Sequence, residues 1–113
     1  MEIKEKIIIA TDFSDSPGSR YREDGDYSGQ QFLEEILLPA FEKAVKDGYK
    51  ILIDLDNVWG YPSSFISGSF GKLSEAKGSE LVFKHIEFKS EESEARLEEI
   101  IKEIKNPRTH AKK

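Results

Sequence analysis

The segment YKILIDLDNVWGYPSSFISGSFGKL, Tyr49–Leu73, predicts a strand, a turn and a helix in direct succession. Its first part, Tyr49–Asp56, is nearly continuously apolar, which is typical of a strand covered on both faces in a parallel sheet. The predicted turn then consists of Trp59, Gly60, Tyr61 and Pro62. Two serines follow, and apolar residues recur at helical spacing after them. This segment therefore predicts the strand-to-helix connection of an α/β fold.

The flanking sequence repeats the alternation. Two further runs of β-branched and aromatic residues, Lys6–Phe13 and Leu81–Phe88, are predicted strands. Amphipathic segments predict three helices, at residues 28–48, 63–78 and 90–107. Because strand and helix alternate three times, the sequence predicts one α/β domain over residues 1–106, with a mostly parallel or mixed sheet. A basic, disordered tail is expected over residues 107–113.

Capping residues set the expected helix boundaries. Ser28 and Ser90 are suited to be N-caps, whereas Gly48 and Gly78 are suited to end the first and second helices. Pro39 predicts a kink in the first helix, or two short helices in series. The apolar stripes predict these buried residues: Phe32, Ile36, Leu37, Ala40, Phe41, Ala44, Val45, Phe65, Ile66, Phe70, Leu73, Leu97, Ile100, Ile101 and Ile104.

Composition narrows the function classes. The 113 residues carry a net charge of −5, which disfavours a duplex-binding domain. The chain contains no cysteine, so disulfides, thiolate zinc sites and a cysteine nucleophile are excluded. No long apolar run predicts a membrane span, and no secretory signal is visible, so a cytoplasmic location is expected.

Catalytic patterns are missing from the sequence. The two histidines, His85 and His110, have no nucleophile or metal-ligand spacing around them. No Gly-x-Ser-x-Gly elbow precedes the second helix, and neither a P-loop nor a dinucleotide glycine pattern is present. We therefore expect a non-enzymatic protein without a cofactor.

The polar segment 14–27 is too long for an ordinary strand-to-helix connection. Ligands of open parallel sheets bind beyond the carboxyl ends of the strands, and both this segment and the turn at 57–64 leave such ends. Arg20 and Arg22 are suited to bind an anion there, and Ser28-Gly29 to present helix amides to it. The alternative is that the arginines pair with neighbouring acids, which are Asp15, Glu23, Asp24 and Asp26.

A calcium-loop spacing overlaps this segment. It consists of Asp24, Asp26, Ser28, Gly29 and Glu35. The preceding Pro17-Gly18 cannot lie in an entering helix, and the predicted helix stripe begins inside the supposed loop. Turn residues followed by an N-cap are therefore the preferred interpretation, and no metal site is expected.

The run Ile53–Leu73 resembles the central segment of STAS domains, the fold of bacterial anti-sigma-factor antagonists. It shares with them a strand ending in Asp-Leu, a short turn, a serine pair and a helix rich in small residues. The wider set SDSPGSRY, DG, SGQQF, LLP and GYPSSFISGSFGKL resembles a STAS-like bacterial family of unassigned function, from Ile7 to Ile104.

This resemblance implies a regulatory switch. In such antagonists a partner kinase of the GHKL type, related to histidine-kinase ATPases, phosphorylates a serine at this helix start and thereby abolishes binding. Ser64 is the closer match to the modified serine, and Ser63 is the second candidate. Two positions depart from the pattern: Pro62 stands for an acidic residue, and Phe65 for a glycine.

Three functions remain open from the sequence. The leading one is a protein-binding module whose surface combines Arg20, Arg22, the Ser28-Gly29 helix start and the turn from Trp59 to Ser64. Its small residues, Ser67, Gly68 and Gly71, would let a partner backbone approach closely, unless they only pack inside the domain. The rival is a small-molecule or nucleotide-phosphate site built from segment 14–27 and the two helix N-termini. The third is a purely structural subunit.

Overall fold

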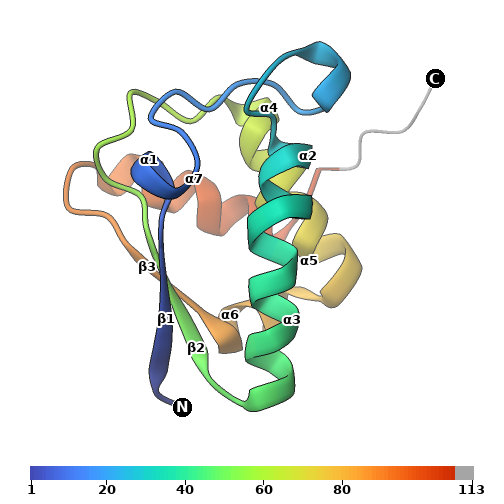
Figure 1. Ribbon diagram of the computed structural model, residues 1–113, viewed down its shortest axis with the longest axis vertical. Helices are drawn as coiled ribbons and strands as arrows, with labels where there is room; N and C mark the ends of the chain where they lie inside the picture. The colour runs from blue at the N-terminus through green and yellow to red at the C-terminus, as the bar shows by residue number, and fades with distance from the viewer. Residues whose placement is uncertain (109–113) are drawn as a thin grey trace.

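The computed structural model describes residues 1–108. Within them, β1 (Ile3–Ile8), β2 (Lys50–Asp54) and β3 (Ile86–Lys89) form a parallel sheet in the order β1-β2-β3. The longer helices gather on one face of this sheet (Figure 1). Strand residues of the other face, such as Lys6 and Glu87, are exposed. The α/β class and the parallel sheet are thus confirmed, although only one face is covered.

The first long helix is continuous. It consists of α2 (Gly29–Phe32), a π-helical turn η2 (Leu33–Leu37) and α3 (Leu38–Asp47). The predicted caps are confirmed: Ser28 Oγ accepts the N–H of Gln31 at 3.0 Å, and Gly48 has a left-handed φ of 77°. Pro39 lies two residues after the π turn, and the helix continues through it in place of two separate helices.

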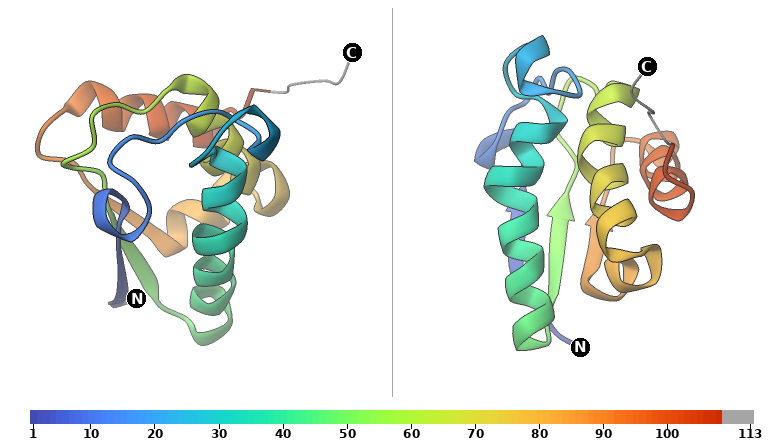
Figure 2. Two further views of the ribbon diagram at one scale, coloured as in Figure 1. Left: turned by 45° about the horizontal axis from the view of Figure 1, so that its top comes forward. Right: turned by 90° about the vertical axis from the view of Figure 1, so that its right-hand side faces the viewer.

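The second long helix consists of α4 (Ser63–Ile66), a second π-helical turn η3 (Ser67–Gly71) and α5 (Lys72–Lys77). It lies beside the first long helix, as Figure 2 shows. All four of its predicted inward residues are buried: Phe65, Ile66, Phe70 and Leu73. The two long helices therefore meet face to face over the core.

Two predicted strands were too long. β1 ends at Ile8, and a helical turn α1 (Ile9–Asp12) follows, because the Asp12 carboxylate accepts the N–H of Ile8 at 2.7 Å. The first five residues of predicted strand Leu81–Phe88 belong to α6 (Ser79–His85). Gly78, with a φ of 89°, lets the chain turn and start this helix.

The last helix begins later than predicted. α7 (Glu94–Lys105) is capped by Ser93, whose Oγ accepts the N–H of Arg96 at 3.1 Å. The expected cap, Ser90, instead donates its hydroxyl to the carbonyl of Ser93 at 2.8 Å. Residues 90–92 are held in a loop by contacts to the end of β2, described below.

The core is close to the predicted one. Of the helical residues predicted to be buried, Val45 is wrong, with 37% of its surface exposed. Three others are partly buried and pack against the core: Ile36, Ala40 and Leu97. Ile101 is also only partly buried. Of the predicted basic tail, Arg108 is placed and contacts α7, while residues 109–113 lie outside the described residues.

Candidate functional site

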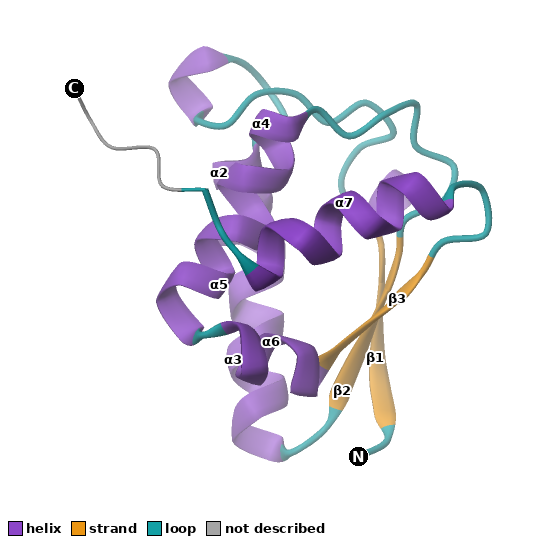
Figure 3. Cartoon of the chain, turned by 180° about the vertical axis from the view of Figure 1, so that it is seen from behind, coloured by secondary structure: helices purple, strands orange, loops and turns teal. Residues whose placement is uncertain are grey.

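Three loops meet at the carboxyl ends of the strands (Figure 3). The N–H of Trp59, after β2, donates to the carbonyl of Asp15, after β1, at 2.8 Å. The N–H of Asn57 donates to the Glu92 carboxylate, after β3, at 2.9 Å. The predicted meeting of segment 14–27 with the turn at 57–64 is therefore confirmed. We call the surface of this region the Trp59 edge: the exposed Asp15, Asn57, Trp59 and Ser63, with the half-buried Ser64.

The buried carboxylate of Asp56 joins the loop after β2 to the loop after β3, beneath the Trp59 edge. Asp56 is 4% exposed, and it accepts the backbone N–H groups of Glu91 and Glu92 at 2.9 and 3.0 Å. It also accepts a hydrogen bond from Lys89 Nζ at 3.1 Å, and Asp54 lies 3.6 Å from the same ammonium. Burial by itself raises the pKa of Asp56, but the amides and Lys89 outweigh it and lower the pKa.

Tyr61 and Arg96 also stabilise the loop after β2. Tyr61 Oη donates to the carbonyl of Leu55 at 2.9 Å, and the Arg96 guanidinium lies 5.0 Å from the centre of the Tyr61 ring. Burial strongly raises the pKa of the Tyr61 hydroxyl, which keeps it protonated as a donor. Sequence reasoning missed Asp56, Lys89 and Arg96. The one signal available was the acidic Asp-Leu-Asp that ends the β2 run.

Trp59, on the same loop, projects into solvent. It is the chain's only tryptophan, and 85% of its surface is exposed. Asp15 and Asn57 line an open hollow beside it. The predicted turn residues Gly60, Tyr61 and Pro62 carry the chain from Trp59 to α4, with Pro62 as the helix cap.

The serine pair begins the second long helix, as the predicted helix over residues 63–78 requires. Ser63 and Ser64 are the first two residues of α4, and neither hydroxyl caps the helix. Pro62 takes the N-cap position, so both serines lie in the first turn of the helix. Ser63 is exposed and Ser64 is half-buried, so Ser63 is the more accessible hydroxyl.

The backbone amides at the start of the first long helix are not available to a ligand. Ser28 and Gly29 are buried, and the N–H groups of Gly29 and Gln30 donate to the carbonyls of Ser19 and Arg20 at 2.7 and 2.9 Å. The expected open helix start is thus corrected, because segment 14–27 itself satisfies these amides.

Glycines permit this closure. A Cβ at Gly29 would lie 2.6 Å from the carbonyl oxygen of Phe65, and a Cβ at Gly68 would lie 2.8 Å from that of Arg20. At Gly71 the side chain of Glu103 fills the space. The small residues of the second helix therefore pack within the domain and do not receive a partner backbone.

The two arginines are also engaged. Arg22 pairs with Glu34 at 3.0 Å and with Glu35 at 3.2 Å, and these acids lie on the helix instead of in the loop as expected. Arg20 is half-buried, and its backbone and Cγ pack against Gly68. Within residues 1–108, no group of three or more His, Asp or Glu side chains is arranged to hold a metal ion.

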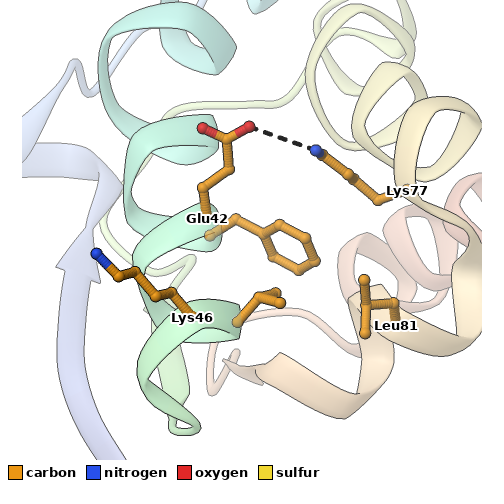
Figure 4. A pocket seen from close by; sticks show the side chains of 6 residues that line it. Glu42, Lys46, Lys77 and Leu81 are labelled. Atoms are coloured by element: carbon orange, nitrogen blue, oxygen red, sulfur yellow. Dashed lines mark hydrogen bonds and ion pairs between the residues drawn. The ribbon is translucent and has the colours of Figure 1, made fainter.

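An apolar groove lies at the opposite end of the domain, between α3 and α6 (Figure 4). Its volume is about 180 Å³, and a Glu42–Lys77 ion pair of 3.3 Å lies across it. Small-molecule pockets are typically about 300–1,000 Å³. The groove is therefore smaller than a typical small-molecule pocket, and none of its lining residues belongs to segment 14–27.

Comparison with known proteins gives one match. The family described as "STAS-like domain of unknown function (DUF4325)" matches residues 28–96, which is more than half of the chain. The match covers both long helices, β2, β3 and the turn that carries Trp59. The chain matches no curated protein and no solved structure. No helix within residues 1–108 is both long and apolar enough to cross a membrane.

Proposed function

The chain belongs to the STAS-like domains of unknown function, and we propose that it is a non-enzymatic regulatory module that binds a protein partner through the Trp59 edge. A tryptophan in solvent contributes nothing to the core, yet tryptophan is among the residues that contribute most to protein interfaces. The observation that carries the proposal is the 85% exposure of Trp59 on a turn whose backbone is held by Asp15 and, through Asn57, by Glu92. Because the backbone of this turn is already held, binding through Trp59 requires less ordering of the chain.

We propose that the partner is a GHKL-type ATPase with serine-kinase activity, as in the antagonists that the family resembles. Its target is the serine pair, and the exposure of Ser63 favours it over Ser64. In the reaction the serine oxygen bonds to the γ-phosphorus of ATP as the bond to ADP breaks, and a base on the kinase takes the hydroxyl proton. The added charge of about −1.5 to −2 lies beside the Trp59 turn and opposes docking.

Intact mass spectrometry tests the covalent step. The protein is incubated with ATP and a bacterial lysate, and a gain of about 80 Da is expected, the mass of one phosphate. Ser63→Ala should remove the gain, whereas Ser79→Ala, at the start of α6, serves as the matched control. If the chain gains no mass in a lysate that phosphorylates a reference substrate, the kinase part of the proposal is wrong.

Trp59 fluorescence tests the docking step. A purified kinase that modifies the chain should shift the emission of Trp59 on binding, because burial removes water from the indole. Phosphorylated protein should give no shift at the same concentrations. A kinase that binds Trp59→Ala as tightly as the wild type would show that docking uses another surface.

The rival nucleotide-phosphate function has a weaker structural basis. At the first helix start it requires open amides, yet those of Gly29 and Gln30 are occupied by carbonyls of the chain itself. Within segment 14–27 it also requires an available arginine, whereas Arg22 is bound to two glutamates.

A further inference from the structure

The last described residue of the chain lies against the start of α4. Glu103, on α7, is only 6% exposed, and its carboxylate accepts both the backbone N–H and the Nε of Arg108 at 2.9 Å. Arg108 Nη2 donates in turn to the carbonyl of Ser63 at 3.2 Å. An arginine 45 residues away in sequence is thereby brought to the first residue of the helix.

The position of Glu103 depends on a glycine of the second helix. A Cβ at Gly71 would lie 2.7 Å from the Glu103 carboxylate, so a larger residue there would displace the acid. A buried carboxylate is costly unless it is paired and hydrogen-bonded. Arg108 supplies both the charge and two donors, and Glu103 therefore fixes where the guanidinium lies.

We propose that Arg108 is the phosphate-binding residue of this domain and that it binds a phosphate on Ser63. The proposal rests on the proposed function, since it names how the modified serine is held. The guanidinium has five N–H donors, of which the Glu103 and Ser63 contacts use two. Within residues 1–108, Nη1 has no hydrogen-bond partner, so two of its donors face no acceptor there.

Covalent geometry brings the two groups within reach. The phosphate would be attached to the side chain of Ser63, whose own carbonyl already binds the guanidinium. Arginine binds phosphate in a bidentate, charge-assisted manner, and the Nη atoms can do so while Nε stays on Glu103. Modification would then connect the start of α4 to α7 through Arg108, without breaking an existing ion pair.

The arrangement also separates the two serines. Arg108 donates a hydrogen bond to the backbone of Ser63, and within residues 1–108 it makes no hydrogen bond to Ser64. Both lie in the first turn of α4, so the helix dipole favours a phosphate on either. Arg108 adds a specific partner at position 63 alone, which makes Ser63 the position where a phosphate is held on the domain.

The test uses protein with phosphoserine incorporated during synthesis, so that no kinase is required. One sample carries phosphoserine at position 63, and a matched control carries it at position 79. Ser79 is also the first residue of a helix, α6. Phosphorus-31 NMR then follows the second ionisation of each phosphate, which is near pH 6 when the group is unpaired.

We expect phosphoserine 63 to titrate at least about half a pH unit lower than it does with Arg108→Gln, because a nearby cation stabilises the dianion. Arg108→Lys should give an intermediate midpoint, since it keeps the charge but loses the planar fork. The control phosphate at position 79 should titrate identically with and without Arg108. An unchanged midpoint at position 63 would overturn the proposal.

The outcome is separable from that of the proposed function. If the lysate leaves Ser63 unmodified but Arg108→Gln shifts the titration, the kinase proposal is wrong and the phosphate site stands. If the kinase modifies Ser63 but the phosphate titrates at the same pH with and without Arg108, the kinase proposal stands and the phosphate site is wrong. Should Arg108→Gln unfold because Glu103 is left unpaired, the variant Glu103→Gln with Arg108→Gln removes both charges and gives the same comparison.

Discussion

The carboxylate of Asp56 accepts the backbone N–H of Glu91, 35 residues further along the chain, at 2.9 and 3.0 Å. This contact joins the end of β2 to the loop before α7. The next residue after Asp56 is Asn57, which has a positive φ of 65° and donates its N–H to Glu92. The turn that presents Trp59 is therefore set by a buried acid three residues before it in the sequence.

The hydrogen bonds of Asp56 predict a pH-dependent stability. Burial raises its pKa, but the two amides and Lys89 lower it to a net value below that of the unfolded chain. The stabilisation is thus present above the unfolded pKa of about 3.9 and is lost as the pH falls below it. Asp56→Asn should lower the free energy of unfolding by about 2 kcal/mol at neutral pH and flatten its acid decline.

Urea unfolding of the wild type and Asp56→Asn between neutral pH and acid measures this. Asp15→Asn, at an exposed position of the same edge, is the control and should retain the wild-type slope. If the free energy of unfolding of Asp56→Asn falls as steeply with acid as that of the wild type, the pH dependence comes from other carboxylates.

Gly29 should not tolerate a side chain. Its added Cβ would lie 2.6 Å from a backbone oxygen of the neighbouring helix, which cannot move independently. Gly29→Ala is expected to cost about 1–3 kcal/mol, as overpacking does. Gly60→Ala is the matched control, because nothing lies within 4 Å of its Cβ. Similar unfolding midpoints for both variants in urea would contradict the close packing of α2 on α4.

Two neighbouring buried serines should respond in opposite directions. Ser67 Oγ is buried and, within residues 1–108, has no hydrogen-bond partner, whereas Ser69 Oγ donates to the carbonyl of Phe65 at 2.8 Å. Ser67→Ala should leave the free energy of unfolding unchanged or raise it by up to about 1 kcal/mol. Ser69→Ala should lower it by about 1 kcal/mol. Thermal melts of both variants measure the difference. An equal loss of stability in Ser67→Ala and Ser69→Ala would indicate that the Ser67 hydroxyl does make a hydrogen bond.

The start of α4 should accept negative charge. Ser63→Asp places a carboxylate in the first turn of an exposed helix start, where the dipole contributes about 0.3–1 kcal/mol in its favour. Ser69→Asp instead buries a charge without a partner and should unfold the domain. Circular dichroism melts compare the two variants. A large loss of stability in Ser63→Asp would show that this serine is packed and not accessible.

Trp59 should contribute to binding and not to folding. Trp59→Ala should change the free energy of unfolding by less than about 0.5 kcal/mol, as exposed substitutions do. Phe65→Ala, in the core, should cost about 3–5 kcal/mol. The wild-type indole should be quenched by acrylamide almost as readily in the folded as in the unfolded chain. Strong protection from quenching in the isolated protein would indicate that Trp59 is already covered.

Local patterns were sufficient for the framework. The apolar run of β2, the caps Ser28 and Gly48, and the inward residues of the second helix follow from periodicity and end chemistry that a few neighbouring residues supply. The meeting of two loops at one edge follows as well, because parallel strands place their carboxyl ends together. For this reason the sequence by itself determined the α/β class, the parallel sheet and the location of the candidate site.

Contacts between residues far apart in the sequence could not be predicted from such local patterns. Leu81–His85 is apolar enough for a strand, but packing after the Gly78 turn makes it helical. The cap of α7 moved from Ser90 to Ser93 because Asp56 binds the intervening amides.

The candidate site changed for the same reason. The amides at Gly29 and Gln30 are taken by the loop before them, while Trp59 is left in solvent. Glu103 carries Arg108 to the start of α4, a pairing that no spacing in the sequence indicates. Tertiary structure alone decided which polar groups remain available to a partner, because a hydrogen bond or ion pair can be assigned only when both of its distant members have been placed.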